Sequence, residues 1–235
     1  MRAELNFKYF FGSKSTETHP LQVKSVIFHQ LRVDRVLADI DHAGISLVPR
    51  PDQAFVSLTH QGSLRHDLGK LDVPYYIFEA TKYEPAARDY QEIIDRHPAD
   101  TILRLGGEQF VLSDPFLANL IYHHHPDTPQ RPIAGLNSQR PTSPSFDWAL
   151  TYLIVADRIV SAQETHRFYN HNGISDKEAT IAKLSDKLEM AGLGGIIDLP
   201  KAVAVGYQTF SQLGFWEYPS FSYPAHYYQN PALPK

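Results

Sequence analysis

Three short stretches of this chain carry residue types that bind metal ions. His66 and Asp67 are adjacent, three histidines occupy 123–125, and Asp157 follows later in an apolar segment. Imidazole and carboxylate ligands together suit transition ions such as Mn, Fe or Zn. Two such ions held close together can bind a phosphate and activate water. The ordered set therefore predicts a two-metal phosphohydrolase centre.

The vicinal pair His66-Asp67 needs a special backbone. On a regular helix, adjacent side chains point about 100° apart, so the two could not face one small ion. At a helix end the backbone can relax and both side chains can converge. We expect Gly69 to supply a flexible exit and Lys70 a cation near the bound phosphate. The alternative is an exposed helix end with ordinary charged residues.

The histidine run and Asp157 support the metal interpretation. Asp157 lies in the largely apolar stretch 153–160, where a carboxylate is costly to bury unless it is paired or metal-bound. The histidines follow an apolar helical pattern and precede a proline-rich loop, which favours ligation over a surface run. The residues alone leave open which two of His123, His124 and His125 bind.

The bulk composition sets only broad limits. With 235 residues and 43% apolar content, the chain can bury a full core. A net charge of -4 gives no electrostatic reason to expect a nucleic-acid or membrane binder. The absence of cysteine excludes disulfides and thiolate chemistry. Because no apolar signal core or membrane-length run is present, we expect a cytoplasmic protein.

The hydrophobic periodicity predicts a mostly α protein. We expect an aromatic N-terminal segment over 1–20, one domain over 21–210 and an irregular, Tyr- and Pro-rich tail over 211–235. Gly44 and Pro98 are expected to end helices. The expected helices are 21–44, 52–67, 86–97, 114–124, 146–166, 175–191 and 198–210. Residues 126–144 form a proline-rich loop of roughly 20 residues, a length that suggests function.

The motifs resemble the HD superfamily of metal-dependent phosphohydrolases. The segment 66–74 reads His-Asp-Leu-Gly-Lys-Leu-Asp-Val-Pro, and Tyr122-His-His and Val155-Ala-Asp-Arg follow in order. His29-Gln-Leu-Arg-Val and Arg96-His-Pro are similar to further histidine motifs of that family. The resemblance is closest to the HD-GYP cyclic-dinucleotide phosphodiesterases and covers about residues 25–210. It implies an HD-domain helical bundle.

The resemblance also implies a ligand set. Asp67 would bridge two divalent ions, and Lys70 would contact a phosphate oxygen. The Tyr-His-His context favours His123 and His124 as the ligands from the histidine run. One ion would be held by His29, His66, Asp67 and Asp157, and the other by Asp67, His97, His123 and His124. The ions would be Mn, Fe, Zn or Ni.

Two departures from the family pattern shape the functional expectation. Ser25 stands where members with a third metal carry an acid, which favours two metals. The Gly-Tyr-Pro signature is absent from the loop at 129–136. We expect a phosphodiesterase that hydrolyses a cyclic or linear dinucleotide through a metal-bridging hydroxide, with Arg131 or Arg140 on a second phosphate.

Two alternatives stay open. The chain could be a nucleotidase or single-strand nuclease of HD type, although a nuclease should carry a basic, aromatic groove that the acidic net charge disfavours. It could also be a non-catalytic interaction module braced by metal. The sequence leaves the oligomeric state open.

Overall fold

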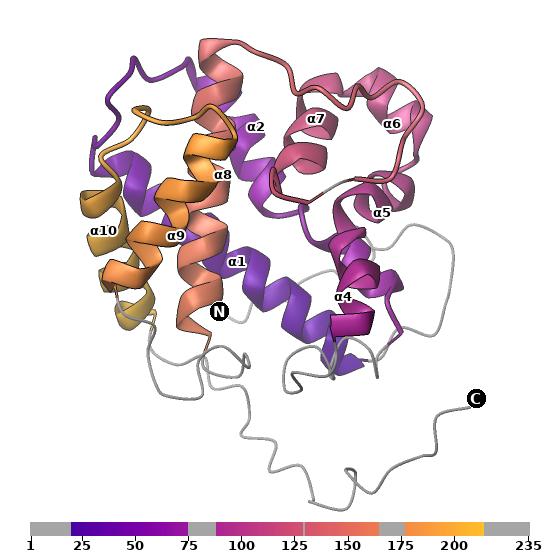
Figure 1. Cartoon of the computed structure of the whole chain (residues 1–235), viewed down its shortest axis with the longest axis horizontal. Helices are drawn as coiled ribbons and strands as arrows, with labels where there is room; N and C mark the ends of the chain where they lie inside the picture. The colour runs from indigo at the N-terminus through magenta and orange to yellow at the C-terminus, as the bar shows by residue number, and fades with distance from the viewer. Residues whose placement is uncertain (1–19, 75–87, 129, 165–176, 214–235) are drawn as a thin grey trace, which may run out of the picture.

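The computed structural model describes residues 20–74, 88–128, 130–164 and 177–213, and these are mostly helical (Figure 1). The described residues contain no β-strand, only an isolated antiparallel bridge between Ser46 and Ile197. The mostly α fold class is therefore confirmed. The predicted N-terminal segment and most of the tail, 1–19 and 214–235, lie outside the described residues.

The helices of the described residues are named in chain order. They are α1 (Pro20–His42), α2 (Gln53–Ser63), the 3₁₀ helix η2 (Leu68–Asp72), α4 (Arg88–Asp95), α5 (His97–Arg104), α6 (Glu108–Ser113), α7 (Pro115–His123), α8 (Pro144–Gln163), α9 (Lys177–Met190) and α10 (Leu199–Gln212). None of the helices in these described ranges is both long and apolar enough to cross a membrane.

The main hydrophobic core forms around α1 and α8. Helix α1 packs against α2, α8 and α10, and α8 also contacts α9, so these elements lie side by side (Figure 1). Val36 and Leu37 of α1 and Leu153 of α8 are fully buried. Trp148 stacks on Tyr152 within α8, with ring centroids 3.9 Å apart. Apolar residues at helical spacing on α1 explain why this helix forms where the periodicity predicts it.

A second, separate core joins α5, α6 and α7. Its fully buried members include Ile102 of α5 and Leu117 and Ile121 of α7. A small third cluster packs Leu68 and Leu71 of η2 against Val26 of α1. The η2 helix, which directly follows the His-Asp pair, contacts both α1 of the larger core and α5 of the second core.

Side-chain caps define several helix starts. Asp114 accepts a hydrogen bond from the Leu117 amide at the start of α7. Ser143 caps α8 in the same way and Asp198 caps α10. These polar residues accept from amides that have no partner within the helix. Gly44 follows α1 with a φ of 61°, as expected for a helix stop.

Two predicted helix boundaries were wrong. Helix α2 ends at Ser63 rather than near 67, because residues 64–67 form turns instead of continuing the helix. Pro98 does not terminate a helix; it lies in the first turn of α5, which begins at His97. A proline is tolerated there because the first amides of a helix have no internal acceptor. Helices α5 and α6 were not predicted.

Candidate metal centre

The turn that carries His66 and Asp67 is held by Thr101 of α5. The Thr101 hydroxyl accepts from the Gly69 amide at 2.7 Å and donates to the His66 carbonyl at 3.0 Å. A β-carbon on Gly69 would overlap the His97 carbonyl oxygen and lie 2.6 Å from the Thr101 amide nitrogen. The prediction that Gly69 is a flexible exit was therefore wrong, because the turn approaches α5 too closely for any side chain.

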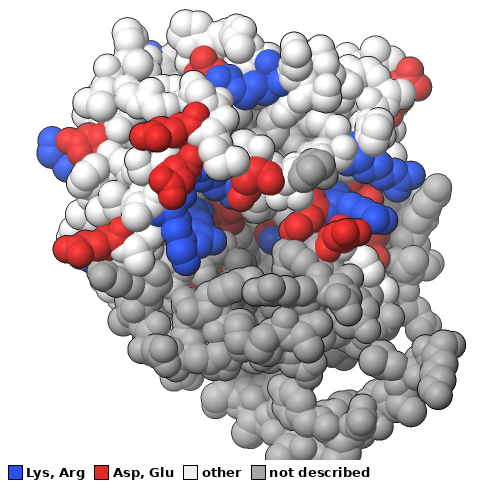
Figure 2. All heavy atoms as spheres, in the orientation of Figure 1, with Lys and Arg blue, Asp and Glu red and all other residues white. Residues whose placement is uncertain are grey.

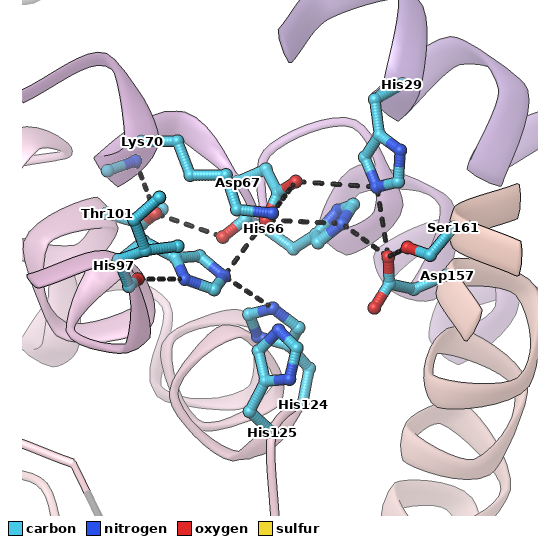
Figure 3. Close-up of polar contacts among 12 residues, drawn as sticks. His29, His66, Asp67, Lys70, His97, Thr101, His124, His125, Asp157 and Ser161 are labelled. Atoms are coloured by element: carbon cyan, nitrogen blue, oxygen red, sulfur yellow. Dashed lines mark hydrogen bonds and ion pairs between the residues drawn. The ribbon is translucent and has the colours of Figure 1, made fainter. Parts of the chain in front are cut away.

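Seven side chains from five parts of the chain point toward one centre (Figure 3). All are buried or nearly so. Six of them belong to the predicted ligand set. The residues are His29 of α1, His66 and Asp67 of the turn, His97 of α5, His124 and His125 after α7, and Asp157 of α8.

One group of ligand atoms surrounds His29. Its Nε2 lies 3.0 Å from Asp157 Oδ1 and 3.4 Å from Asp67 Oδ2. Nε2 of His66 lies 3.8 Å from the same Asp157 oxygen and 3.7 Å from Asp67 Oδ1. His29, His66 and Asp67 alone place three ligand atoms within 4.8 Å of one another. This geometry allows them to surround a single ion.

A second group lies on the other side of Asp67. Nε2 of His97 is 3.0 Å from Asp67 Oδ1 and 3.2 Å from Nε2 of His124. The His125 ring packs against both other rings, with centroids 4.9 Å from His97 and 4.3 Å from His124. These three histidines also offer ligand atoms within 4.8 Å of one another. Asp67 therefore lies between the two groups.

Backbone carbonyls define the tautomer of three of the histidines. In each, Nδ1 lies within hydrogen-bond distance of the carbonyl three residues earlier, so Nδ1 carries the proton and Nε2 keeps a lone pair. The pairs are His66 with Ser63 at 2.8 Å, His97 with Ile94 at 2.7 Å and His124 with Ile121 at 2.6 Å. Metal-ligating histidines commonly use their second nitrogen in this way.

The arrangement of polar atoms at this centre fits a bound cation. With both Nδ1 atoms donating, His97 and His124 bring two lone pairs within 3.2 Å of each other and no proton lies between them. His66 Nε2 and Asp67 Oδ1 are buried without any hydrogen-bond partner among the described residues. A buried acceptor without a partner is costly. Divalent ions would satisfy all of these atoms, so the residues present fit a metal centre.

The two carboxylates of the centre are ionised. Burial disfavours the charged form, yet Lys70 and the surrounding imidazoles hold the pKa of Asp67 well below its usual range. For Asp157, the hydrogen bond with His29 and the nearby His66 imidazole likewise outweigh burial and lower the pKa. Burial also lowers the pKa of His29, but attraction to Glu164 and hydrogen bonds with Asp157 and Glu164 raise it to about 9.

The histidines of the second group are neutral. Burial, followed by repulsion from neighbouring imidazoles, lowers the pKa of His124 and of His125 well below the usual range. Burial and the charge of Lys70 lower the pKa of His97, although Asp67 partly opposes them. Neutral imidazole is the form that binds metals. The charge states therefore match a ligand role.

The structure brings His125 rather than His123 to the centre. Helix α7 ends at His123, whose ring packs against Tyr122 with a centroid distance of 5.0 Å. Burial and the nearby Arg140 lower the pKa of His123 to about 4. The predicted pair His123 and His124 is replaced in this geometry by His124 and His125, because consecutive residues at a helix end face different directions.

The three residues predicted to bind phosphate have different surroundings. Lys70 lies at the centre, with Nζ 2.6 Å from Asp67 Oδ2. Arg131 is exposed, and its carbonyl accepts from the Tyr122 hydroxyl. Arg140 instead donates to the Ala191 carbonyl at 3.0 Å and to the Asp147 carboxylate, so it joins the loop to the end of α9. A phosphate-binding role for Arg131 or Arg140 stays a prediction.

Several residues around the centre were not predicted. Glu164 contacts His29, and Ser161 donates to Asp157 at 3.2 Å. Lys187 of α9 lies 3.4 Å from Nδ1 of His125 and 3.0 Å from Asp127. The positions of Ser161 and Glu164, four and seven residues after Asp157, could have identified them, because such spacings share one helix face.

Comparison with known proteins adds nothing to this geometry: no protein-family model, curated protein or solved structure matches the chain.

Proposed function

We propose that this protein is a two-metal phosphohydrolase that cleaves a phosphodiester, in the manner of the HD enzymes that its motifs resemble. The observation that carries the proposal is the position of Asp67 between two groups of buried ligand atoms. A carboxylate in that position can bridge two ions through its two oxygens. His29, His66 and Asp157 would complete one position, and His97, His124 and His125 would complete the other beside Asp67.

The chain's own residues prepare the centre for this chemistry. When bound, the two ions supply Lewis acidity for a phosphoryl oxygen and acidify a water molecule. Lys70 Nζ donates to one oxygen of Asp67 at 2.6 Å and, as an ammonium with three hydrogens, can also donate to a phosphate oxygen. Burial of the ligands excludes bulk water, which strengthens these electrostatic interactions.

The charge distribution favours a small nucleotide over a long nucleic acid. On the face shown in Figure 2, acidic and basic side chains of the described residues are intermixed and form no continuous basic stripe. Binding along a single strand would require such a stripe. We therefore favour a cyclic or linear dinucleotide as substrate. A cytoplasmic setting fits this proposal, since a chain without cysteine needs no oxidising compartment.

A substrate panel tests the proposal. Protein of known metal content, supplied with Mn, is assayed against bis-p-nitrophenyl phosphate, cyclic di-GMP and short single-stranded DNA. We expect cleavage of the first two and little of the third. Selective cleavage of DNA or of mononucleotides would show that the substrate is that phosphate ester and not a dinucleotide. Two tightly bound ions without any turnover would contradict the enzymatic proposal and favour a structural brace.

The histidine run provides a matched pair of variants. His124→Ala should remove one of the two ions and most of the activity, because its Nε2 faces His97 at 3.2 Å. His123→Ala should keep both ions, since its ring lies against Tyr122 instead. Metal analysis of the two purified variants measures the difference. Loss of an ion from His123→Ala would instead support the sequence prediction that His123 is a ligand.

A further inference from the structure

His29 differs from the other histidines of the centre in what orients it. Nδ1 of His29 lies 3.0 Å from a carboxylate oxygen of Glu164, whereas His66, His97 and His124 use backbone carbonyls. The side chains of His29 and Glu164 are 4% and 2% exposed, so this contact is shielded from water. A charged acceptor in such a place forms a stronger hydrogen bond than a carbonyl does.

Helix α8 contacts both nitrogens of the same imidazole. Asp157 Oδ1 lies 3.0 Å from Nε2 of His29, and Glu164 Oε1 lies 3.0 Å from Nδ1. The two acidic residues are seven positions apart, which is about two helical turns and therefore one helix face. The ring is thus fixed from both sides by a single rigid element.

Glu164 is in turn held at its place. Its backbone amide donates to the Val160 carbonyl at 3.0 Å, which makes it the cap residue of α8. The Arg32 guanidinium on α1, one turn after His29, lies 3.5 Å from the same Glu164 oxygen that contacts His29. The Arg32 guanidinium also lies 5.6 Å from the centroid of the Phe210 ring. The carboxylate therefore has little freedom to turn away from His29.

We propose that Glu164 is a positioning residue that sets the metal affinity of the His29 position alone. When an ion takes the place of the proton on Nε2 of His29, Glu164 keeps the remaining proton on Nδ1, and its charge makes the imidazole a stronger metal ligand. The second position, built on His97 and His124, has no carboxylate of this kind among the described residues and does not depend on Glu164. This inference rests on the metal centre proposed above.

Glu164→Gln separates charge from shape, because glutamine keeps an acceptor oxygen at nearly the same place. Equilibrium dialysis against increasing Mn²⁺, followed by metal analysis, counts the ions bound per chain. We expect one of the two binding steps to weaken about 10- to 100-fold and the other to stay unchanged. Glu189→Gln, an exposed position on α9, is the matched control and should bind as the wild type does.

A variant that binds a single ion shows which of the two ions Glu164 affects. His97→Gln should leave a single ion at the His29 position, and adding Glu164→Gln should then weaken that remaining ion. Arg32→Gln, which removes the cation beside Glu164, should weaken the same ion to a smaller extent and provides a test if Glu164→Gln does not fold. A thermal melt of each metal-free variant checks folding.

The outcomes distinguish this inference from the proposed function. Two ions bound to Glu164→Gln with wild-type affinity, in a wild-type protein that binds two, would overturn the role of Glu164 and leave the metal centre intact. Equal weakening of both ions would also overturn it, because the effect would not be confined to the His29 position. A wild-type protein that binds no Mn²⁺ would overturn the metal centre and the role of Glu164 together.

Discussion

Replacing Asp67 with alanine is expected to remove both metal ions and all phosphodiester hydrolysis. Asp67 approaches both ligand groups, with Oδ2 3.4 Å from His29 and Oδ1 3.0 Å from His97. Removing a shared ligand weakens both positions, and in the metal-free variant it leaves the Lys70 ammonium without its 2.6 Å partner. Metal analysis of the purified variant and hydrolysis of bis-p-nitrophenyl phosphate measure the result.

The matched control for this variant is Asp72→Ala. Asp72 is an exposed aspartate five residues further along, at the end of η2, where it pairs with Arg104 rather than with the centre. Asp72→Ala should keep both ions and its activity. If Asp67→Ala retained two ions per chain, Asp67 would not be the bridge and the proposed centre would be wrong.

Gly69→Ala is expected to destabilise the fold by about 3 kcal/mol, near the upper end for overpacking. The added methyl group would overlap the His97 carbonyl oxygen and lie 2.6 Å from the Thr101 amide nitrogen, and both are backbone atoms of the first turns of α5. Backbone atoms cannot move aside as a flexible side chain can. Urea denaturation of the metal-free protein measures the change in the free energy of unfolding.

Gly194→Ala is the control for the general effect of replacing a glycine. The nearest atom to its added β-carbon is a side-chain carbon of Glu189 at 4.0 Å, which is ordinary contact. Its unfolding free energy should change by no more than about 0.5 kcal/mol. If Gly69→Ala were equally harmless, the η2 turn could move away from α5, and the tight packing described for Thr101 would not hold in solution.

The parts of the fold that depend on local signals were predictable. Helix α1 shows apolar residues at three- and four-residue steps, and α7 begins at Asp114-Pro115, a cap followed by a first-turn proline. Both signals arise within a few residues of sequence. Helix α5 was missed because Pro98 looks like a helix end from sequence, whereas packing against η2 and α7 favours a new helix there.

The residue types of the ligand set were predictable from sequence, but the directions in which their side chains point were less so. Motif spacing identified His66, Asp67 and Asp157, and the structure brings them together. The choice between His123 and His125 depended on which residue ends α7, and a shift of one position there turns a side chain by about 100°. Glu164 was not predicted, because it belongs to no sequence motif and only its seven-residue spacing from Asp157 points to it.

The candidate metal centre joins parts of the chain that belong to two different hydrophobic cores. His29 and Asp157 belong to the helices of the larger core, whereas His97 lies on α5 of the smaller one. Ions shared through Asp67 would cross-link segments separated by as many as 128 residues, as the His29–Asp157 contact shows. In a chain without cysteine, such ions would stabilise the folded state by binding to it alone, because the unfolded chain does not bring these ligands together.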